Sequence, residues 1–194
     1  IIGLILLFIG REAPLVFPKK SMLVVLPFEN LGSPGDEYFV DGLTEEITNR
    51  LAALQELGVI SRTSAVLYKN TKKSIKEIEA ELRVDFVLEG SVRWDRNPGG
   101  QDRVRVSAQL IRVSDDTHFW SENFERILQD LFIVQSEIAE QIVKQLDIKI
   151  LEPERQALRA KPTGNLQAYD LYLRAQERLP QAYNTQDRRY YDQV

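Results

Sequence analysis

The feature that most constrains the fold is a run of alternating side chains between residues 84 and 124. Two stretches carry an apolar or small residue at every second position: Phe86, Leu88, Gly90, Val92 and Trp94, then Val104, Val106, Ala108 and Leu110. A third stretch runs from His118 to Phe124, and turn-forming residues at 97–100 and 114–116 separate the three. Because successive side chains of a strand point to opposite faces, the pattern predicts a three-stranded antiparallel meander.

Helical and strand patterns flank this meander. An apolar run at 22–26 predicts a buried strand, and Val59-Ile60 predicts another short one. Apolar residues three or four positions apart predict helices near 43–54, 75–82 and 128–146, the second opened by a capping box at Ser74 and Glu77. We therefore expect an α/β fold, a mixed sheet with packed helices in the order β-α-β-α-β-β-β-α.

The two ends of the chain differ from its centre. Residues 1–9 are uncharged and apolar, as in the last part of a transmembrane helix, which needs about 20 such residues. The core of a signal peptide and a buried element of the domain remain alternatives. We expect the end of a truncated transmembrane helix at 1–10, a linker at 11–20, the α/β domain at 21–150, a linker or helix at 151–164 and a further helical segment at 165–194.

Composition narrows the chemistry. The chain has no cysteine, which excludes disulfides and thiolate chemistry in this span, and it has one histidine, His118. A formal net charge of -4 argues against nucleic acid as a partner. No phosphate-binding loop, dinucleotide-binding glycine pattern or metalloprotease motif occurs. We predict no catalytic residue, no cofactor and no metal site.

Acidic residues cluster around Asp41, and they allow two interpretations. Paired carboxylates can hold a divalent cation or perform acid–base chemistry. Acidic residues also stabilise the first turn of a helix, where the macrodipole favours them, and we favour this structural interpretation. The cluster comprises Asp36, Glu37, Asp41, Glu45 and Glu46.

Two short stretches are candidates for binding a partner or an anion. Arg62, Thr63 and Ser64 combine a cation with hydroxyl groups, although such runs are often solvated loops. Glu89 and Ser91 flank a glycine inside a predicted strand, where glycine marks a bulge or the close approach of another backbone.

Ordered short matches from about residue 21 to about residue 175 make the chain resemble the TolB-like domain, related to the amino-terminal domain of the TolB protein. The loop at 32–36 is shorter than the usual form, and Val40 stands where alanine is usual. The matching stretches are Val24 to Leu31, Glu37-Tyr38-Phe39, Asp41 to Ile47, Ser61 to Ser64, Val87 to Arg93, Ala108 to Ile111, Trp120-Ser121-Glu122, Phe132 to Ala139 and Ala168 to Leu173.

The resemblance implies a bacterial membrane signalling protein. An output module such as a winged-helix regulator, a cyclase or a kinase would lie upstream, and tetratricopeptide repeats would begin with a helical hairpin at 165–194. The α/β domain would then be a non-catalytic sensor or protein-interaction module in the periplasm, anchored to the inner membrane, with a protein partner and a possible homo-oligomeric state. An envelope scaffold of the lipoprotein-like kind is the alternative, and a metal-dependent enzyme using the Asp41 cluster is a third.

Overall fold

The computed structural model describes residues 20–96, 99–160 and 163–185. The strands are β1 (Ser21–Val25), β2 (Glu29–Asn30), β3 (Leu57–Val59), β4 (Phe86–Asp95), β5 (Arg103–Arg112) and β6 (Thr117–Ile127). The helices are α1 (Glu37–Ala52), α2 (Arg62–Ala65), α3 (Ile75–Leu82), α4 (Leu131–Gln145), α5 (Glu152–Arg159) and α6 (Leu166–Thr185). Short 3-10 turns occupy η1 (Pro34–Asp36), η2 (Val66–Tyr68) and η3 (Leu128–Asp130).

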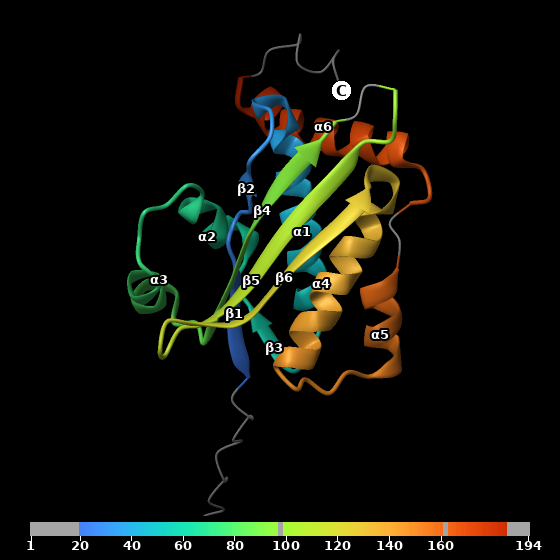
Figure 1. Ribbon diagram of the computed structural model, residues 1–194. Coiled ribbons are helices and arrows are strands. Elements are labelled where there is room, and N and C mark those ends of the chain that lie inside the picture. Colours follow the sequence, from blue (N-terminus) through green and yellow to red (C-terminus); the bar gives the residue numbers. More distant parts are fainter. Residues whose placement is uncertain (1–19, 97–98, 161–162, 186–194) are drawn as a thin grey trace, which may run out of the picture.

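The strands form one mixed sheet in the order β3-β1-β4-β5-β6, with β2 pairing beside β4 (Figure 1). The pairs β1–β3, β1–β4 and β2–β4 are parallel, whereas β4, β5 and β6 form the predicted antiparallel meander. The expected fold class is therefore confirmed, and the predicted elements follow one another as expected, with β2 and α2 as short additional elements. A register shift between Leu110 and Ile111 interrupts the ladder with β6.

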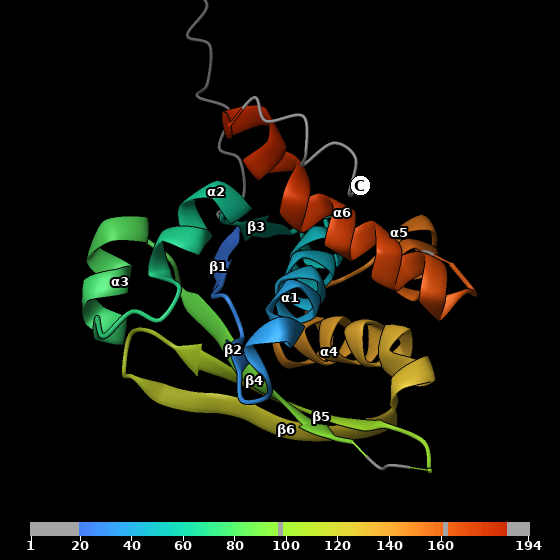
Figure 2. The same ribbon diagram turned by 90° about the horizontal axis from the view of Figure 1, so that it is seen from above.

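Helices α1 and α4 cover one face of the sheet, and α6 crosses above them (Figures 1 and 2). The predicted stripes are buried along α1 and in the middle of α4, as Leu43, Ile47 and Ile138 illustrate with 0% exposure. On the other face, α2 and α3 enclose a smaller core around Val24, Val87 and the α3 residue Ile78, and they cover only the β1 side of the sheet.

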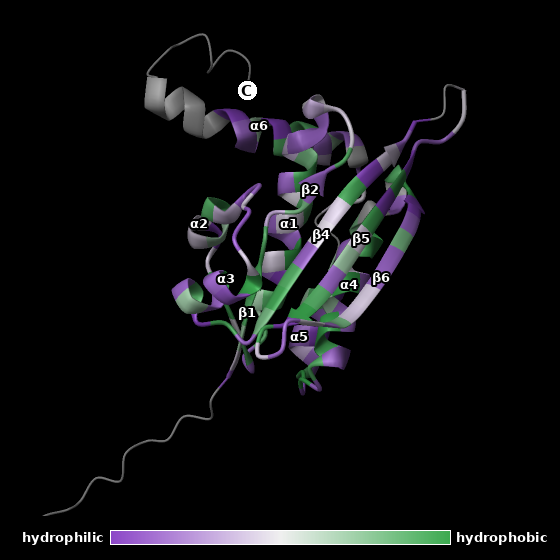
Figure 3. Ribbon diagram, turned by 60° about the vertical axis from the view of Figure 1, so that its left-hand side comes forward, coloured by the Kyte–Doolittle hydropathy of each residue, from purple (hydrophilic) through white to green (hydrophobic). Residues whose placement is uncertain are grey.

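The outer face of the meander is polar. The colouring of Figure 3 alternates along β5 and β6, as the sequence pattern predicts. Charged and polar residues alternate there with buried or half-buried ones: Glu89, Ser91 and Arg93 on β4, Arg103, Arg105, Ser107 and Gln109 on β5, and Ser121, Asn123 and Glu125 on β6. Residues 97–98 of the first predicted turn lie outside the described residues.

The start of one helix differs from the expectation. Helix α1 begins at Glu37, six residues before the first position of the predicted apolar stripe, because Tyr38, Phe39 and Val40 are all buried and so break the helical periodicity. The capping box of α3 is present as predicted: the Ser74 amide donates to Glu77 Oε2 at 2.7 Å, and the Glu77 amide donates to Ser74 Oγ at 3.3 Å.

The predicted terminal segments are tested only in part. Residues 1–10, where we expect a transmembrane helix, lie outside the described residues. Across the part of the chain that is described, no helix is long and apolar enough to cross a membrane. The predicted helix from Leu166 is present as α6, whereas the partner helix of a repeat hairpin would fall at residues 186–194, which are not described.

Candidate functional site

A tightly bonded loop positions the start of α1. The Asn30 side chain donates to the carbonyl of Ser33 at 2.7 Å and accepts from the amide of Gly32 at 2.9 Å. Ser33 then caps η1, whose last residue, Asp36, immediately precedes α1. The loop thereby brings the carboxylate of Asp36 to the same end of the molecule as the last residues of β4.

Aromatic side chains form the inner wall beside this carboxylate. Because side chains alternate along β4, Trp94 lies on the face of the strand that packs against α1. The centres of the Trp94 and Phe39 rings are 4.9 Å apart in an edge-to-face contact. Phe132, in the first turn of α4, makes a similar contact with Tyr169 of α6 at 4.6 Å. The wall thus joins strand β4 to helices α1, α4 and α6.

The first of two charged pairs lies on the sheet side of the wall. The guanidinium of Arg96 donates to Oδ1 of Asp36 and lies 5.4 Å from the centre of the Trp94 ring. The Asp36 residue is only 9% exposed. Its second oxygen, Oδ2, and the indole Nε1 of Trp94 are both buried without a hydrogen-bond partner among the described residues.

The second charged pair belongs to α6. The hydroxyl of Tyr38 donates to Asp170, and Arg174 donates to Asp170 Oδ2 at 2.8 Å and to the Tyr38 oxygen at 2.7 Å. The Arg174 guanidinium also lies 4.4 Å from the centre of the Tyr38 ring. Burial and the bond to Asp170 raise the pKa of Tyr38 to about 12, so the phenol stays protonated at neutral pH.

These groups surround a cavity of about 750 Å³. It opens between the carboxyl end of β4, the amino-terminal turns of α1 and α4, and the start of α6. The lining residues are Asp36, Tyr38, Phe39, Trp94, Arg96, Leu128, Phe132, Thr163, Gly164, Asn165, Gln167, Asp170 and Arg174. We refer to it as the α6 cavity.

Close packing holds α6 against α1 beneath the cavity. Tyr169 and Leu173 are 2% and 3% exposed, and a side chain at Gly42 would come within 2.5 Å of the Leu173 Cδ2 atom. The Tyr169 hydroxyl accepts from the fully buried amide of Gln135 at 3.3 Å. Glycine at position 42 therefore allows the two helices to approach.

The linker before α6 is also anchored. Arg50, near the end of α1, is 7% exposed and donates to the carbonyls of Leu158 and Ala160, the latter at 2.8 Å. These carbonyls lie at the end of α5, where helix carbonyls lack intrahelical partners. Burial lowers the pKa of Arg50. The arginine thus fixes the chain just before it enters α6.

The predicted residues Glu89 and Ser91 line a second, polar cavity of about 460 Å³. It lies at the carboxyl end of β1, which has β3 on one side and β4 on the other, a position where open α/β sheets commonly bind ligands. Burial raises the pKa of Glu89. Other lining residues include Pro27, Tyr68, Asn70, Thr71, Lys73 and Gln109.

The predicted residues Arg62, Thr63 and Ser64 lie elsewhere, on the short helix α2. Arg62 faces Glu45 at 3.3 Å, and Ser64 shares a hydroxyl contact with Ser61 at 3.3 Å. The structure therefore does not bring this triplet together with Glu89 and Ser91 in the cavity those two line.

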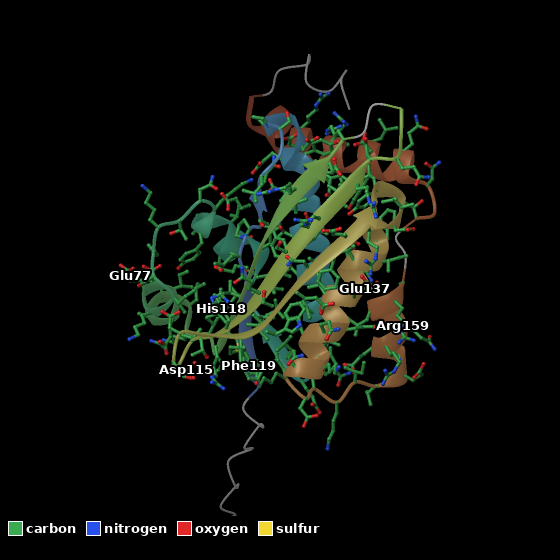
Figure 4. The ribbon with its side chains drawn as sticks, in the orientation of Figure 1. Glu77, Asp115, His118, Phe119, Glu137 and Arg159 are labelled. Atoms are coloured by element: carbon green, nitrogen blue, oxygen red, sulfur yellow. The ribbon has the colours of Figure 1, made fainter. Side chains whose placement is uncertain are left out.

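The remaining candidates have ordinary surroundings. Lys69 contacts Asp41 and Glu37, each at 2.7 Å, so the acidic cluster carries its own cation. No group of three or more histidine, cysteine or acidic side chains among the described residues could hold a metal ion. His118 is exposed at the start of β6, near the β5–β6 turn and at the far end of the sheet from α6 (Figure 4).

Sequence reasoning did not identify the α6 cavity. Its charged groups come from distant segments, since 60 positions separate Asp36 from Arg96 and 132 separate Tyr38 from Asp170. A signal was nonetheless present: Tyr38 and Asp170 both fall in stretches that carry the resemblance to the TolB-like domain. A shared family stretch in the first turn of α1 and another in α6 could have indicated that they meet.

Comparison with known proteins gives matches of three kinds. The family model described as "HilA/YgeH-like transcriptional regulator, second domain" matches residues 19–150. A Rhizobium meliloti protein named "Putative adenylate cyclase 3" is 37% identical over 174 residues, which are 89% of this chain and 29% of that protein. The chain therefore spans less than a third of this relative.

The third match is structural. The crystal structure of TolB from Acinetobacter baumannii is 14% identical, with a TM-score of 0.50 over 66% of this chain and 29% of that one. This likeness confirms the predicted TolB-like architecture at the level of the fold. Since the family model covers more than half of the sequence, the chain belongs to the family of HilA/YgeH-like transcriptional regulators and contains their second domain.

Proposed function

We propose that this chain is the non-catalytic sensor and protein-interaction module of a bacterial regulatory protein. The observation that carries the proposal is the docking of α6 onto the α/β domain around a shared cavity. A partner or ligand that contacts both walls would alter how firmly α6 is held. The module would thereby convert binding into a change at the helix that continues the chain.

The comparisons support an input role rather than an output role. The matched family is named for transcriptional regulation, whereas the Rhizobium meliloti relative is named for cyclase activity. Two proteins with such different outputs would share this domain only if it serves a common purpose. That purpose is recognition, and the output chemistry would reside in another part of each protein.

The proposed setting is the bacterial envelope. The apolar residues 1–9 support an inner-membrane anchor, and the absence of cysteine is compatible with an oxidising periplasm. Leu171 and Tyr172 on α6 are 64% and 52% exposed, as expected of a helix that a following helix covers. This exposure supports a tetratricopeptide-like segment from residue 165 onward.

The polar outer face is the proposed contact surface for a protein partner. It includes Glu89 and Ser91, and we retain Arg62, Thr63 and Ser64 as a separate candidate contact on α2. Strand β6 ends the order of the sheet, so its 11 residues offer an edge for strand addition by a partner or a second copy. This edge is the feature that favours the alternative function, an envelope scaffold.

The test uses the full-length protein in its own bacterium. Residues 20–185 are deleted in frame, and the output that the rest of the protein performs, gene expression or nucleotide synthesis, is measured at matched protein levels. We expect the output to be locked on or off, and Asp170→Asn to shift it in the same direction. An output that still responds normally after the deletion would refute the sensor role and favour the scaffold.

A further inference from the structure

The α6 cavity has the size and lining of a ligand site. Packed protein interiors leave few voids larger than a water molecule, whereas small-molecule sites measure about 300–1,000 Å³. The α6 cavity measures about 750 Å³. Its walls combine an aromatic floor with a few charged groups, the composition that such sites share.

The charges indicate what kind of ligand fits. The body contributes Asp36 and Arg96, and α6 contributes Asp170 and Arg174, so each wall carries one carboxylate and one guanidinium. A ligand with a single charge would meet a like charge on both walls. A ligand with a separated cation and anion can place each beside an opposite charge.

Asp36 is the group that a ligand cation would satisfy. One of its oxygens contacts Arg96, while Oδ2 is buried and without a partner among the described residues. An unpaired buried polar atom costs roughly 1–3 kcal/mol, and more for a charged group. The side chain of Arg96 is 57% exposed and so has room to swing outward and admit an ammonium group.

Arg174 is suited to the other end of the ligand. Its Nε and Nη2 atoms donate to Asp170 and to Tyr38, which fixes the plane of the guanidinium. Among the described contacts, Nη1 is the nitrogen left to donate to a carboxylate. The rings of Phe39, Trp94 and Phe132 line the same cavity and would receive an apolar side chain.

We propose that the α6 cavity binds a zwitterionic small molecule, a free amino acid or short peptide with an apolar side chain, its ammonium on Asp36 and its carboxylate on Arg174. Such a ligand would bridge the α/β body and α6. The binding itself does not depend on the proposed sensor function, so each can fail without the other.

The experiment uses intrinsic fluorescence. The chain has two tryptophans, and Trp120→Phe leaves Trp94, in the cavity wall, as the reporter. The full chain is titrated with L-phenylalanine, with glycyl-L-phenylalanine, and with two singly charged analogues, phenethylamine and 3-phenylpropionate. We expect a saturable change in fluorescence with at least one zwitterion and at least tenfold weaker binding of both analogues. Which zwitterion binds more tightly distinguishes an amino-acid ligand from a peptide ligand.

Variants then assign the two ends. Asp36→Asn is expected to weaken zwitterion binding at least tenfold while leaving 3-phenylpropionate unaffected. Asp115→Asn is the matched control, because it also removes the carboxylate of an aspartate–arginine pair but lies at the opposite end of the sheet (Figure 4). If Asp36→Asn does not fold, Arg96→Gln is titrated instead and should bind zwitterions at least as tightly as the parent chain. Equal binding of zwitterions and analogues, no binding of either zwitterion, or unchanged affinity in Asp36→Asn would overturn the proposal.

Discussion

Tyr38 is the residue through which α1 holds α6. Its hydroxyl donates to Asp170 and accepts from Arg174 at 2.7 Å, so one phenol joins two helices. A hydrogen bond to a charged partner contributes about 1.5–3 kcal/mol to stability. The aromatic ring serves the core as well, because the residue is 8% exposed.

Tyr38→Phe should therefore lower the free energy of unfolding by about 2 kcal/mol, since it removes the hydroxyl and keeps the ring. The raised pKa of Tyr38 adds a dependence on pH. Its stabilising effect is complete below the unfolded pKa of about 10 and is lost as the pH rises toward 12. Urea titrations should show a clearly larger difference between the parent and Tyr38→Phe at pH 8 than at pH 11; equal differences would contradict the assignment.

Glu89 illustrates the opposite case, a half-buried carboxylate to which no described residue donates a hydrogen bond. Burial raises its pKa, opposed by the charge of His118 and reinforced by that of Asp116. A carboxyl whose pKa is raised in the folded state destabilises the protein once the pH exceeds its unfolded value. This residue lines the polar cavity beside Ser91, where a cationic or hydrogen-bond-donating partner would relieve the cost.

Glu89→Gln should stabilise the protein at pH 7, by roughly 0.5 kcal/mol on the scale usual for surface substitutions. At pH 4, where the native carboxyl is protonated, the difference should disappear. Thermal melting of both proteins at the two pH values checks this, with Glu125→Gln on the same open face as the control. A variant that is less stable at pH 7 would mean that the carboxylate has a partner in the folded protein.

At the scale of elements, the contact between α1 and α6 depends on Gly42. Alanine in the interior of a helix is normally better than glycine by about 1 kcal/mol. Here an added Cβ would approach the Cδ1 and Cδ2 atoms of Leu173 to 2.8 and 2.5 Å, closer than carbon atoms pack. The gain in helix propensity and the steric overlap therefore oppose each other.

Gly42→Ala alone should loosen α6 and give no net stabilisation. Leu173→Ala removes the overlapping atoms. In that background, Gly42→Ala should raise the free energy of unfolding by about 1 kcal/mol relative to Leu173→Ala alone. A double-mutant cycle of the two substitutions, measured by urea unfolding, yields the coupling. Equal effects of Gly42→Ala in both backgrounds would show that α6 does not pack on α1 at this point.

The linker helix α5 gives a second test at this scale. Arg50→Met should cost about 2 kcal/mol, because it removes two hydrogen bonds from a charged donor to the carbonyls at the end of α5. Arg159→Met is the matched control, since Arg159 is exposed and pairs with Glu140 on the surface, where such pairs contribute roughly 0–1 kcal/mol. If chemical denaturation shows the same loss in free energy of unfolding for both variants, the anchoring role of Arg50 is contradicted.

Elements were more predictable than the site. Alternation fixes the faces of β4 and β5, and the apolar stripes of α1 and α4 repeat regularly, so both could be inferred from local pattern. The start of α1 could not, because the consecutive residues Tyr38, Phe39 and Val40 are all buried and so leave no one-sided apolar stripe. The cavity depends on tertiary contacts between segments more than 30 positions apart, which periodicity does not encode.

At the scale of the whole molecule, α6 is an integral part of the folded unit rather than a separate appendage. It buries Tyr169 and Leu173 in the main core, and the core residues of α1 and α4 lie beneath it. Most of the stability of a helix in a protein comes from the packing of its apolar face rather than from helix propensity. Its order therefore depends on docking, which is the property that would allow an input at the α6 cavity to reach the chain beyond it.

Hydrogen exchange followed by mass spectrometry tests this docking most directly. In the full chain, peptides of α6 covering residues 168–178 should be protected to an extent comparable with peptides of α1 and α4, because all three belong to one cooperative unit. Tyr38→Phe should reduce the protection of α6 far more than that of α4. If α6 of the parent chain exchanges at the rate of an unprotected helix while α1 and α4 remain protected, then α6 is not docked and the cavity is not a shared site.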